Sequence, residues 1–204
     1  MITEHPYPQR SPEWFKVREG KITGTTLKDV MGTPKARTTL MVKRLADMMS
    51  ETEEMVASKA MLHGVNTEDL ARERACEDLQ IAFSQSGFLT NDRLPGFGFS
   101  PDAVHLKEGG LEIKCPDPHT HIRYMLEDDI PKDYYYQVMA PFVLSDDVEW
   151  WYFMSFDNRT YSRPTWYKRV DRDYFGEEKI DECREKIKQF HEELNEKYFE
   201  LSLG

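Results

Sequence analysis

The sequence is poor in cysteine and has no long hydrophobic run. Its 204 residues include three cysteines, which are odd in number and far apart: Cys76, Cys115 and Cys183. This set fits neither a disulfide scaffold nor an iron–sulfur cluster held by four thiolates. No stretch approaches the roughly 18 apolar residues that a membrane-spanning helix needs, and the N-terminus lacks the pattern of a secretory signal. We therefore expect a cytoplasmic protein without a membrane partner.

Repeats, low-complexity tracts and long linkers are also missing. A chain of this length can bury one sizeable core. We expect a single domain over residues 1–204, with a helical N-terminal part to about residue 87, a sheet core over about 88–160 and a C-terminal helix over about 176–201.

Basic side chains are fewer than acidic ones. The sequence has 27 Lys and Arg and 37 Asp and Glu, which give a formal net charge of -10. Taken alone, this balance argues against a nucleic-acid partner, because phosphate binding draws its affinity from Lys and Arg. The deficit is uneven, however. Residues 1–50 hold nine basic and five acidic side chains, and the remaining 18 and 32 lie after residue 50. A locally basic surface is compatible with the total.

The first half of the chain has helical patterns. Helices are expected over residues 23–30 and 37–49, and Ser50 begins a capping box for a helix that ends near Gly64. Thr67 then caps a helix whose apolar face repeats every four residues: Ala71, Ala75, Leu79 and Phe83.

The second half alternates between strand and helix patterns. Residues 103–106 and 111–115 form an expected β-hairpin, 133–144 an expected helix and the aromatic run 149–156 an expected strand. A helix with an apolar stripe follows. These elements indicate a mixed α/β domain, with a mixed sheet flanked by helices.

The hairpin carries the strongest chemical pattern. Strand alternation places Glu112 and Lys114 on one face, and the turn brings Asp102 close to them. Two carboxylates and the Ile113 carbonyl would supply oxygen ligands for Mg²⁺, beside an amine that orients or deprotonates a water. Such an arrangement would be a phosphodiester-hydrolysis site, although this pattern by itself does not favour it over the alternative. The alternative is an ordinary surface hairpin with a Glu–Lys pair.

Two further patterns have competing interpretations. Arg18 lies seven residues before Thr25 at an expected helix start, which suits phosphate binding but also a simple helix cap. Cys115, His119 and His121 have zinc-ligand spacing, yet no fourth ligand lies nearby, so a buried thiol with loop histidines is favoured.

These residues belong to a longer series of motifs. The series contains W-x3-R-x-G-x-I-T-x-[ST] over residues 14–25, Lys59–Gly64 followed by Glu68, Ser100–Asp102 with Leu111–Pro116, Tyr134-x-x-Gln137-Val138, and Trp151–Asp157. In this order the motifs resemble the phage lambda exonuclease family, also called YqaJ-like viral recombinases or alkaline exonucleases, of the PD-(D/E)XK nuclease superfamily.

The resemblance implies an α/β fold with a restriction-endonuclease-like core. It implies an exonuclease that uses Mg²⁺, with two ions per site and Mn²⁺ as a substitute, to degrade one strand of linear double-stranded DNA. Degradation runs from a 5′-phosphorylated end and releases mononucleotides. Family members form a homotrimeric ring around DNA and act with a single-strand annealing protein in recombination. They are encoded by phages or prophages of bacterial hosts.

The resemblance also implies residue roles. Asp102, Glu112 and the Ile113 carbonyl would bind metal, Glu68 would serve a second metal or its water, Lys114 would act on the nucleophile, and Gln137 would position groups around the metals. Arg18 and Thr25 would hold the 5′-terminal phosphate, Met61 would wedge between the strands, and Arg37, in a variable loop, would contact the duplex.

Plainer interpretations stand beside these roles. Glu68 can complement a helix dipole, Gln137 can be an exposed helix residue and Met61 a core residue. Thr25 replaces the serine that is commoner in the family. At the level of function, the alternatives are an endonuclease on the same core and a non-catalytic protein that binds DNA ends.

Overall fold

The computed structural model describes residues 1–50 and 59–203, and the side chains of all of these except 59–66. The elements in chain order are β1 (Ile2–His5), α1 (Pro12–Arg18), β2 (Ile22–Thr23), α2 (Leu27–Val30), α3 (Pro34–Met49), α4 (Lys59–Leu79), β3 (Phe88–Asn91), β4 (Phe97–Phe99), β5 (Ala103–His105), β6 (Gly109–Lys114), α5 (Pro118–Glu127), η1 (Lys132–Tyr134), α6 (Tyr135–Leu144), β7 (Trp150–Phe156), β8 (Thr165–Asp171), η2 (Arg172–Tyr174) and α7 (Glu177–Leu203).

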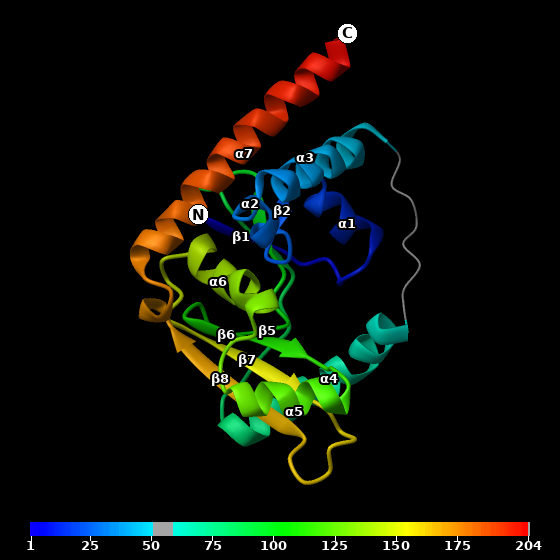
Figure 1. Cartoon of the computed structure of the whole chain (residues 1–204), viewed down its shortest axis with the longest axis vertical. Helices are drawn as coiled ribbons and strands as arrows, with labels where there is room; N and C mark the ends of the chain where they lie inside the picture. The colour runs from blue at the N-terminus through cyan, green and yellow to red at the C-terminus, as the bar shows by residue number, and fades with distance from the viewer. Residues whose placement is uncertain (51–58, 204) are drawn as a thin grey trace.

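The strands form two mixed sheets, so the expected α/β class is confirmed while the expected single sheet is divided (Figure 1). One sheet has the order β1-β3-β4-β2, with β2 parallel to β4. The other has the order β5-β6-β7-β8, with β6 parallel to β7. The N-terminal part, expected to be helical, therefore also contributes β1 and β2 to a sheet.

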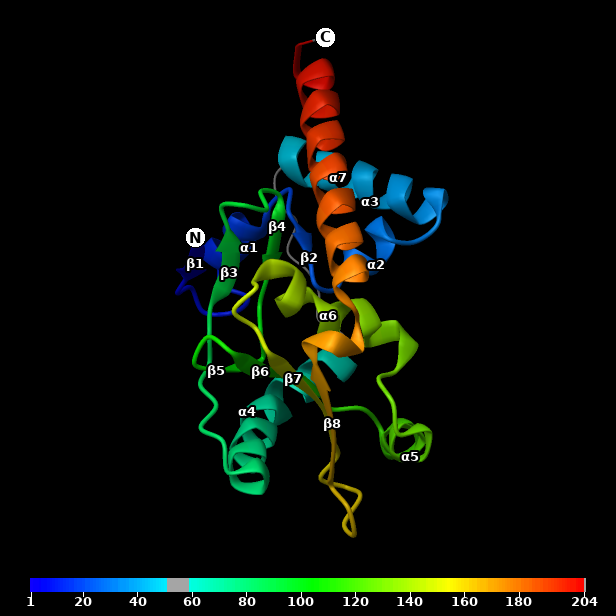
Figure 2. The ribbon, with the colours of Figure 1, turned by 90° about the vertical axis from the view of Figure 1, so that its left-hand side faces the viewer.

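Helices cover both faces of the β5–β8 sheet. α4 packs on one face through an apolar cluster that includes Ala71, Ala75, Leu111 and Ile113. On the other face, α5 and α6 pack against β7, where Tyr124 stacks edge-on against Phe153. Figure 2 shows α4 and α5 on opposite sides of β7 and β8. Strand alternation thus buries Leu111 and Ile113 toward α4 and turns Glu112 toward α6.

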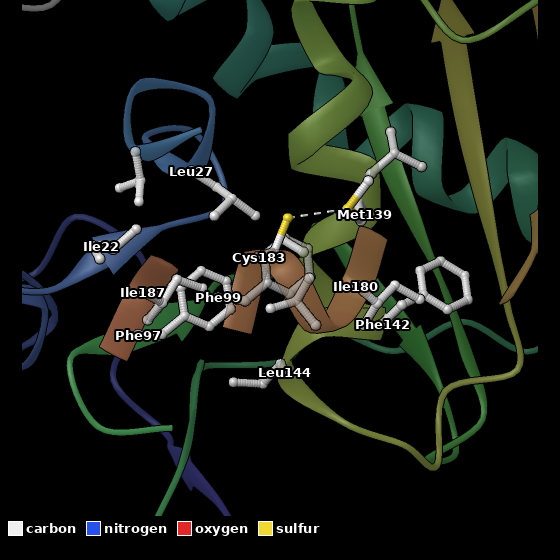
Figure 3. Close-up of a cluster of buried hydrophobic side chains, with 14 of the residues drawn as sticks. Ile22, Leu27, Phe97, Phe99, Met139, Phe142, Leu144, Ile180, Cys183 and Ile187 are labelled. Atoms are coloured by element: carbon white, nitrogen blue, oxygen red, sulfur yellow. Dashed lines mark hydrogen bonds between the residues drawn. The ribbon is translucent and has the colours of Figure 1, made fainter. Parts of the chain in front are cut away.

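A large apolar core joins the remaining helices to the sheets. Side chains from β2, α2, β4, α6 and α7 meet in it, and the Cys183 thiol lies 3.6 Å from the Met139 sulfur (Figure 3). The expected apolar stripe of the C-terminal helix is confirmed, because Ile180, Cys183 and Ile187 are fully buried here. Beyond the core, the end of α7 extends past α3 (Figure 1).

The expected helix break near Gly64 is wrong. α4 runs without interruption from Lys59 to Leu79, so Thr67 lies inside the helix and not at its start. Glycine inside a helix costs about 1 kcal/mol, which the burial of Ala71 and Ala75 against the sheet offsets. The helix ends before Gln80, whose φ is 56°, and Phe83 enters the core from the following segment.

Other expectations have mixed outcomes. The hairpin, the 133–144 helix and the aromatic strand are confirmed with small shifts of their ends. Ser50 ends α3, while the rest of its capping box lies outside the described residues. Among the described residues, no helix is both long and apolar enough to cross a bilayer.

Candidate active site

The β5–β6 hairpin assembles the carboxylates of the site. Ala103 pairs with Leu111, so Asp102 lies opposite Glu112. The Asp102 Oδ2 atom accepts a hydrogen bond of 2.7 Å from the backbone N–H of Ile113, which fixes the aspartate against β6. The sequence-based prediction that Asp102, Glu112 and Lys114 converge is therefore confirmed.

Glu112 is the centre of this cluster and is fully buried. Its Oε1 atom accepts hydrogen bonds from the Lys114 ammonium and from the side-chain amide of Gln137 on α6. Its Oε2 atom is buried and has no hydrogen-bond partner in the described part of the chain. An unsatisfied buried carboxylate oxygen is costly, and a bound cation would satisfy it.

Burial and Asp102 disfavour the charged forms of the two glutamates in the cluster. Burial and the neighbouring Asp102 raise the pKa of Glu112 to about 8. Burial, again with Asp102, raises the pKa of Glu68 on α4 to about 7. Burial also raises the pKa of Asp102, although Lys114 and the Ile113 N–H act in the opposite direction. Such repulsion is relieved when a divalent cation binds between the carboxylates.

Lys114 is held in its charged form. Burial disfavours the ammonium, but the Glu112 and Asp102 carboxylates outweigh this and raise the pKa of Lys114 above its usual value. The Nζ atom also lies 5.0 Å from the centre of the Tyr134 ring, within the range of a cation–π contact. A protonated amine in this place can donate hydrogen bonds to a water or to phosphate oxygens.

The residues present fit a hard divalent cation. Among the side chains that the structure describes, those of residues 1–50 and 67–203, no three from His, Cys, Asp or Glu form a metal site by themselves. Mg²⁺ typically takes one or two carboxylates and completes its shell with water and substrate phosphate. Asp102 and the free oxygen of Glu112 match this requirement, with Glu68 at the edge. The Ile113 carbonyl stays a predicted ligand.

Arg18 lies beside the same site. Its Nη1 atom donates to the Oγ atom of Ser100 at 3.1 Å, and its guanidinium stacks 3.8 Å from the centre of the Trp14 ring. Trp14 also donates to Ser100 Oγ, at 3.1 Å. Burial, followed by repulsion from Arg44, lowers the pKa of Arg18 to about 10. Ser100 thereby connects Arg18 to Asp102, two residues along the chain, a link that sequence reasoning missed.

Thr25 has a different setting from the one expected. The helix that follows it, α2, begins after Thr26 and has four residues, so it is too short to supply a strong helix-terminus anion site. The Thr25 hydroxyl is exposed and lies 3.0 Å from the Thr23 hydroxyl. Within the described residues no hydrogen bond joins Thr25 to Arg18. Their joint role at a phosphate stays a prediction.

The structure gives the positions of two residues that are predicted to contact DNA, Arg37 and Met61. Arg37 lies in the first turn of α3, so the expected loop position is wrong, and it forms a 2.6 Å ion pair with Glu193 of α7. Met61 belongs to α4, but its side chain lies outside the described residues. Contacts of either residue with DNA stay predictions.

The zinc interpretation finds no support. His121 is buried in α5, where its Nδ1 atom lies 2.7 Å from Ser155 Oγ and its Nε2 atom 3.0 Å from the Arg163 carbonyl. Both ring nitrogens are thus in use. Burial raises the pKa of the Cys115 thiol, which disfavours the thiolate that zinc binds. The two histidines lie on a helix, not in a loop.

Comparisons with known proteins agree with this geometry. An alkaline exonuclease from Laribacter hongkongensis superposes with a TM-score of 0.86 at 27% identity, over 94% of this chain and 96% of that one. Its complex with dAMP gives a TM-score of 0.83 at 28% identity, with the same coverage of 94% and 96%. A phage-related exonuclease from Haemophilus somnus 129PT shares the fold, with a TM-score of 0.65 at 14% identity over 90% and 98% of the two chains.

The two comparisons of the sequence with known proteins give different results. No curated protein gives a significant match. Residues 13–146, which are more than half of the chain and include every metal-ligand candidate, match the YqaJ-like viral recombinase domain. The chain therefore belongs to the family of YqaJ-like viral recombinases, as its motifs predict.

Proposed function

We propose that this protein is a metal-dependent exonuclease that degrades one strand of linear double-stranded DNA from its 5′ end. The observation that carries the proposal is the buried Glu112 carboxylate. One of its oxygens is held by Lys114 and Gln137, and the other is buried without a hydrogen-bond partner among the described residues. Similarity to an alkaline exonuclease over nearly the whole chain supports the same activity.

Asp102, Glu112, the Ile113 carbonyl and Glu68 would hold two Mg²⁺ ions, for which Mn²⁺ can substitute. When bound, the metal lowers the pKa of water and neutralises charge on the phosphodiester. Lys114 donates hydrogen bonds to the attacking water and to the phosphate, because its amine is held protonated. Gln137 restricts the rotation of the Glu112 carboxylate. Acid–base and positioning groups of this kind contribute about 10²–10⁴-fold to a rate.

The 5′ end would be recognised next to these groups. Arg18 presents a charged guanidinium within hydrogen-bond distance of Ser100, and an arginine can bind phosphate through two parallel hydrogen bonds. Thr25 adds an exposed hydroxyl. The products would be deoxynucleoside 5′-monophosphates, which accords with the dAMP complex of the Laribacter enzyme.

Family membership alone supports a further part of the proposal, which concerns the oligomer, the partner protein and the host cell. The protein would form a homotrimeric ring around duplex DNA and leave 3′ single strands for a single-strand annealing protein. It would act in the cytoplasm of a bacterial host, encoded by a phage or prophage, since its domain is a viral recombinase domain.

Digestion of linear duplex carrying either a 5′ or a 3′ label tests the proposal, with Mg²⁺ and with EDTA. We expect early release of the 5′ label as mononucleotide, only with Mg²⁺. Early release of the 3′ label would contradict the polarity. Cutting of closed circular DNA would identify an endonuclease, and binding of DNA ends without any product would identify a non-catalytic protein.

A further inference from the structure

A cavity of about 480 Å³ opens beside the candidate active site. Its walls are Glu4 of β1, the arm between β1 and α1 (residues 6–10), the α4 residues Glu68 and Asp69, and residues 85–87 after that helix. Cavities of roughly 300–1,000 Å³ are the size that holds small ligands. Because Glu68 belongs to the carboxylate cluster, the cavity lies next to the site where metal would bind.

Two of the three acidic residues that line the cavity, Glu4 and Asp69, already have partners. The Glu4 carboxylate accepts hydrogen bonds from the Ser86 hydroxyl at 2.8 Å and the Gly87 N–H at 2.9 Å. Asp69 pairs with Arg72, three residues along α4. Among the described residues that line the cavity, Arg10 is the only cation.

Arg10 is exposed and makes no hydrogen bond or ion pair to another described residue. Arg10 and Glu68 both line this cavity, so the arm and one carboxylate of the cluster share the same opening. The cavity therefore has a cation in contact with solvent, next to the groups that would bind metal. A phosphate group suits this arrangement, because a bound metal and the Arg10 guanidinium can share its negative charge.

The arm is built to hold Arg10 in place. Arg10 has a φ of 72°, a left-handed conformation that costs a side-chain-bearing residue about 1–2 kcal/mol. The turn is closed by a 3.0 Å hydrogen bond from the Ser11 N–H to the Pro8 carbonyl. Gln9 donates to the Pro101 carbonyl at 3.4 Å, which ties the arm to the Ser-Pro-Asp motif. Strain of this kind persists at sites that bind ligands.

We propose that this cavity is a second phosphate subsite of the active centre, where Arg10 binds a backbone phosphate of the DNA strand being degraded. The inference rests on the proposed nuclease function. The subsite differs from that of Arg18, whose guanidinium stacks on Trp14 and bonds to Ser100. Arg10 is exposed and is available to a phosphate without breaking a hydrogen bond or ion pair to another residue that the structure describes.

Salt-dependent binding tests the inference. The affinity for a 5′-phosphorylated duplex is measured over a series of KCl concentrations, with Ca²⁺ in place of Mg²⁺ to prevent cleavage. We expect Arg10→Ala to make the slope of log affinity against log salt shallower by about 0.7–0.9, the loss of one phosphate contact. Arg10→Lys keeps the charge and should keep the slope. In digestion assays, Arg10→Ala should raise KM more than it lowers kcat.

Arg93→Ala is the matched control, because Arg93 is an exposed arginine on the turn between β3 and β4, next to Asp92, which pairs with the N-terminal amine. Its slope should be less affected than that of Arg10→Ala. An unchanged slope in Arg10→Ala overturns the inference, even if the pH profile shifts, since that shift alone would mean that Arg10 acts only on Glu68. Wild-type protein that neither binds nor degrades DNA would overturn the proposed function instead.

Discussion

Gln137 donates a hydrogen bond from its side-chain amide to the Oε1 atom of Glu112, which Lys114 also contacts. With one oxygen held by two donors from different elements, the carboxylate cannot rotate freely. Its second oxygen, Oε2, is left buried and without a hydrogen-bond partner among the described residues. The amide of α6 thus determines which oxygen of a β6 residue is available to a cation.

Gln137→Ala should therefore weaken metal binding without unfolding the protein. Residues that orient a metal ligand typically contribute about 10–100-fold to affinity or activity. We expect a loss of that size in the digestion rate, with part of it recovered at high Mg²⁺. Gln189→Ala, an exposed glutamine on α7, is the control and should leave the rate unchanged. If the digestion rate of Gln137→Ala depended on Mg²⁺ concentration as that of the wild type does, Gln137 would not position Glu112 for metal binding.

Asp102→Asn should separate catalysis from folding. The asparagine oxygen can still accept the hydrogen bond from the Ile113 N–H, but the charge that binds metal is gone. We expect nuclease activity to be lost while the circular dichroism spectrum is retained.

Lys114→Ala should lower the rate by about 10²–10⁴-fold, as expected for a group that assists the nucleophile. Substantial activity in either variant would contradict the assigned site.

The convergence of Asp102, Glu112 and Lys114 could be predicted from sequence because its signal is local. Period-two alternation in β6 separates Glu112 and Lys114 from the buried Leu111 and Ile113, and a hairpin returns the chain to Asp102. No such pattern identifies Ser100 as the link between Arg18 and the site. A serine is compatible with any turn, and its contacts come from a helix far away in the sequence.

The missed elements also have physical reasons. The signal for α5 was present, since Asp117 caps a helix that begins at Pro118, but the histidine spacing invited a zinc interpretation. In β8, only Trp166 and Val170 are buried, so alternation is interrupted and gives a weak strand pattern. The resemblance puts Arg37 in a variable loop, although the helix pattern over 37–49 begins at this residue, and its ion pair with Glu193 depends on how α3 packs against α7. Tertiary contacts of this kind leave no local pattern.

Arg18→Ala should reduce the preference for 5′-phosphorylated ends. The guanidinium is the only charged donor that contacts Ser100 among the described residues, so its loss removes the predicted grip on the terminal phosphate. We expect wild-type protein to digest phosphorylated ends faster than 5′-hydroxyl ends, and the variant to digest both at similar, lower rates. Because Arg18 also packs on Trp14, thermal unfolding must be measured in parallel. Equal wild-type rates on both ends would remove the phosphate role.

Gly110→Ala should disturb the candidate active site by distorting the pairing of β5 with β6. A Cβ atom at this position would lie 2.2 Å from the Trp151 ring and 2.6 Å from the Ala103 carbonyl, so β5 and β6 would have to separate. Overpacking typically costs about 1–3 kcal/mol, and here it would also displace Asp102 from Glu112. We expect a lower melting temperature and a larger loss of activity than the stability change explains. Gly176→Ala adds only backbone strain, since its Cβ meets no atom within 4 Å, and should retain activity.

Stability without metal should fall as the pH rises. The pKa of Glu112 is raised in the folded state from 4.5 to about 8, so between these values the folded protein binds more protons than the unfolded chain. The free energy of unfolding therefore decreases with pH across this window. Mg²⁺ takes the place of the protons, so its affinity and its stabilising effect should increase toward alkaline pH. We expect the gain in melting temperature from Mg²⁺, relative to EDTA, to be larger near about pH 9 than near about pH 6. Glu112→Gln should lose most of this difference, whereas a wild-type gain that is independent of pH would contradict the carboxylate cluster as the metal site.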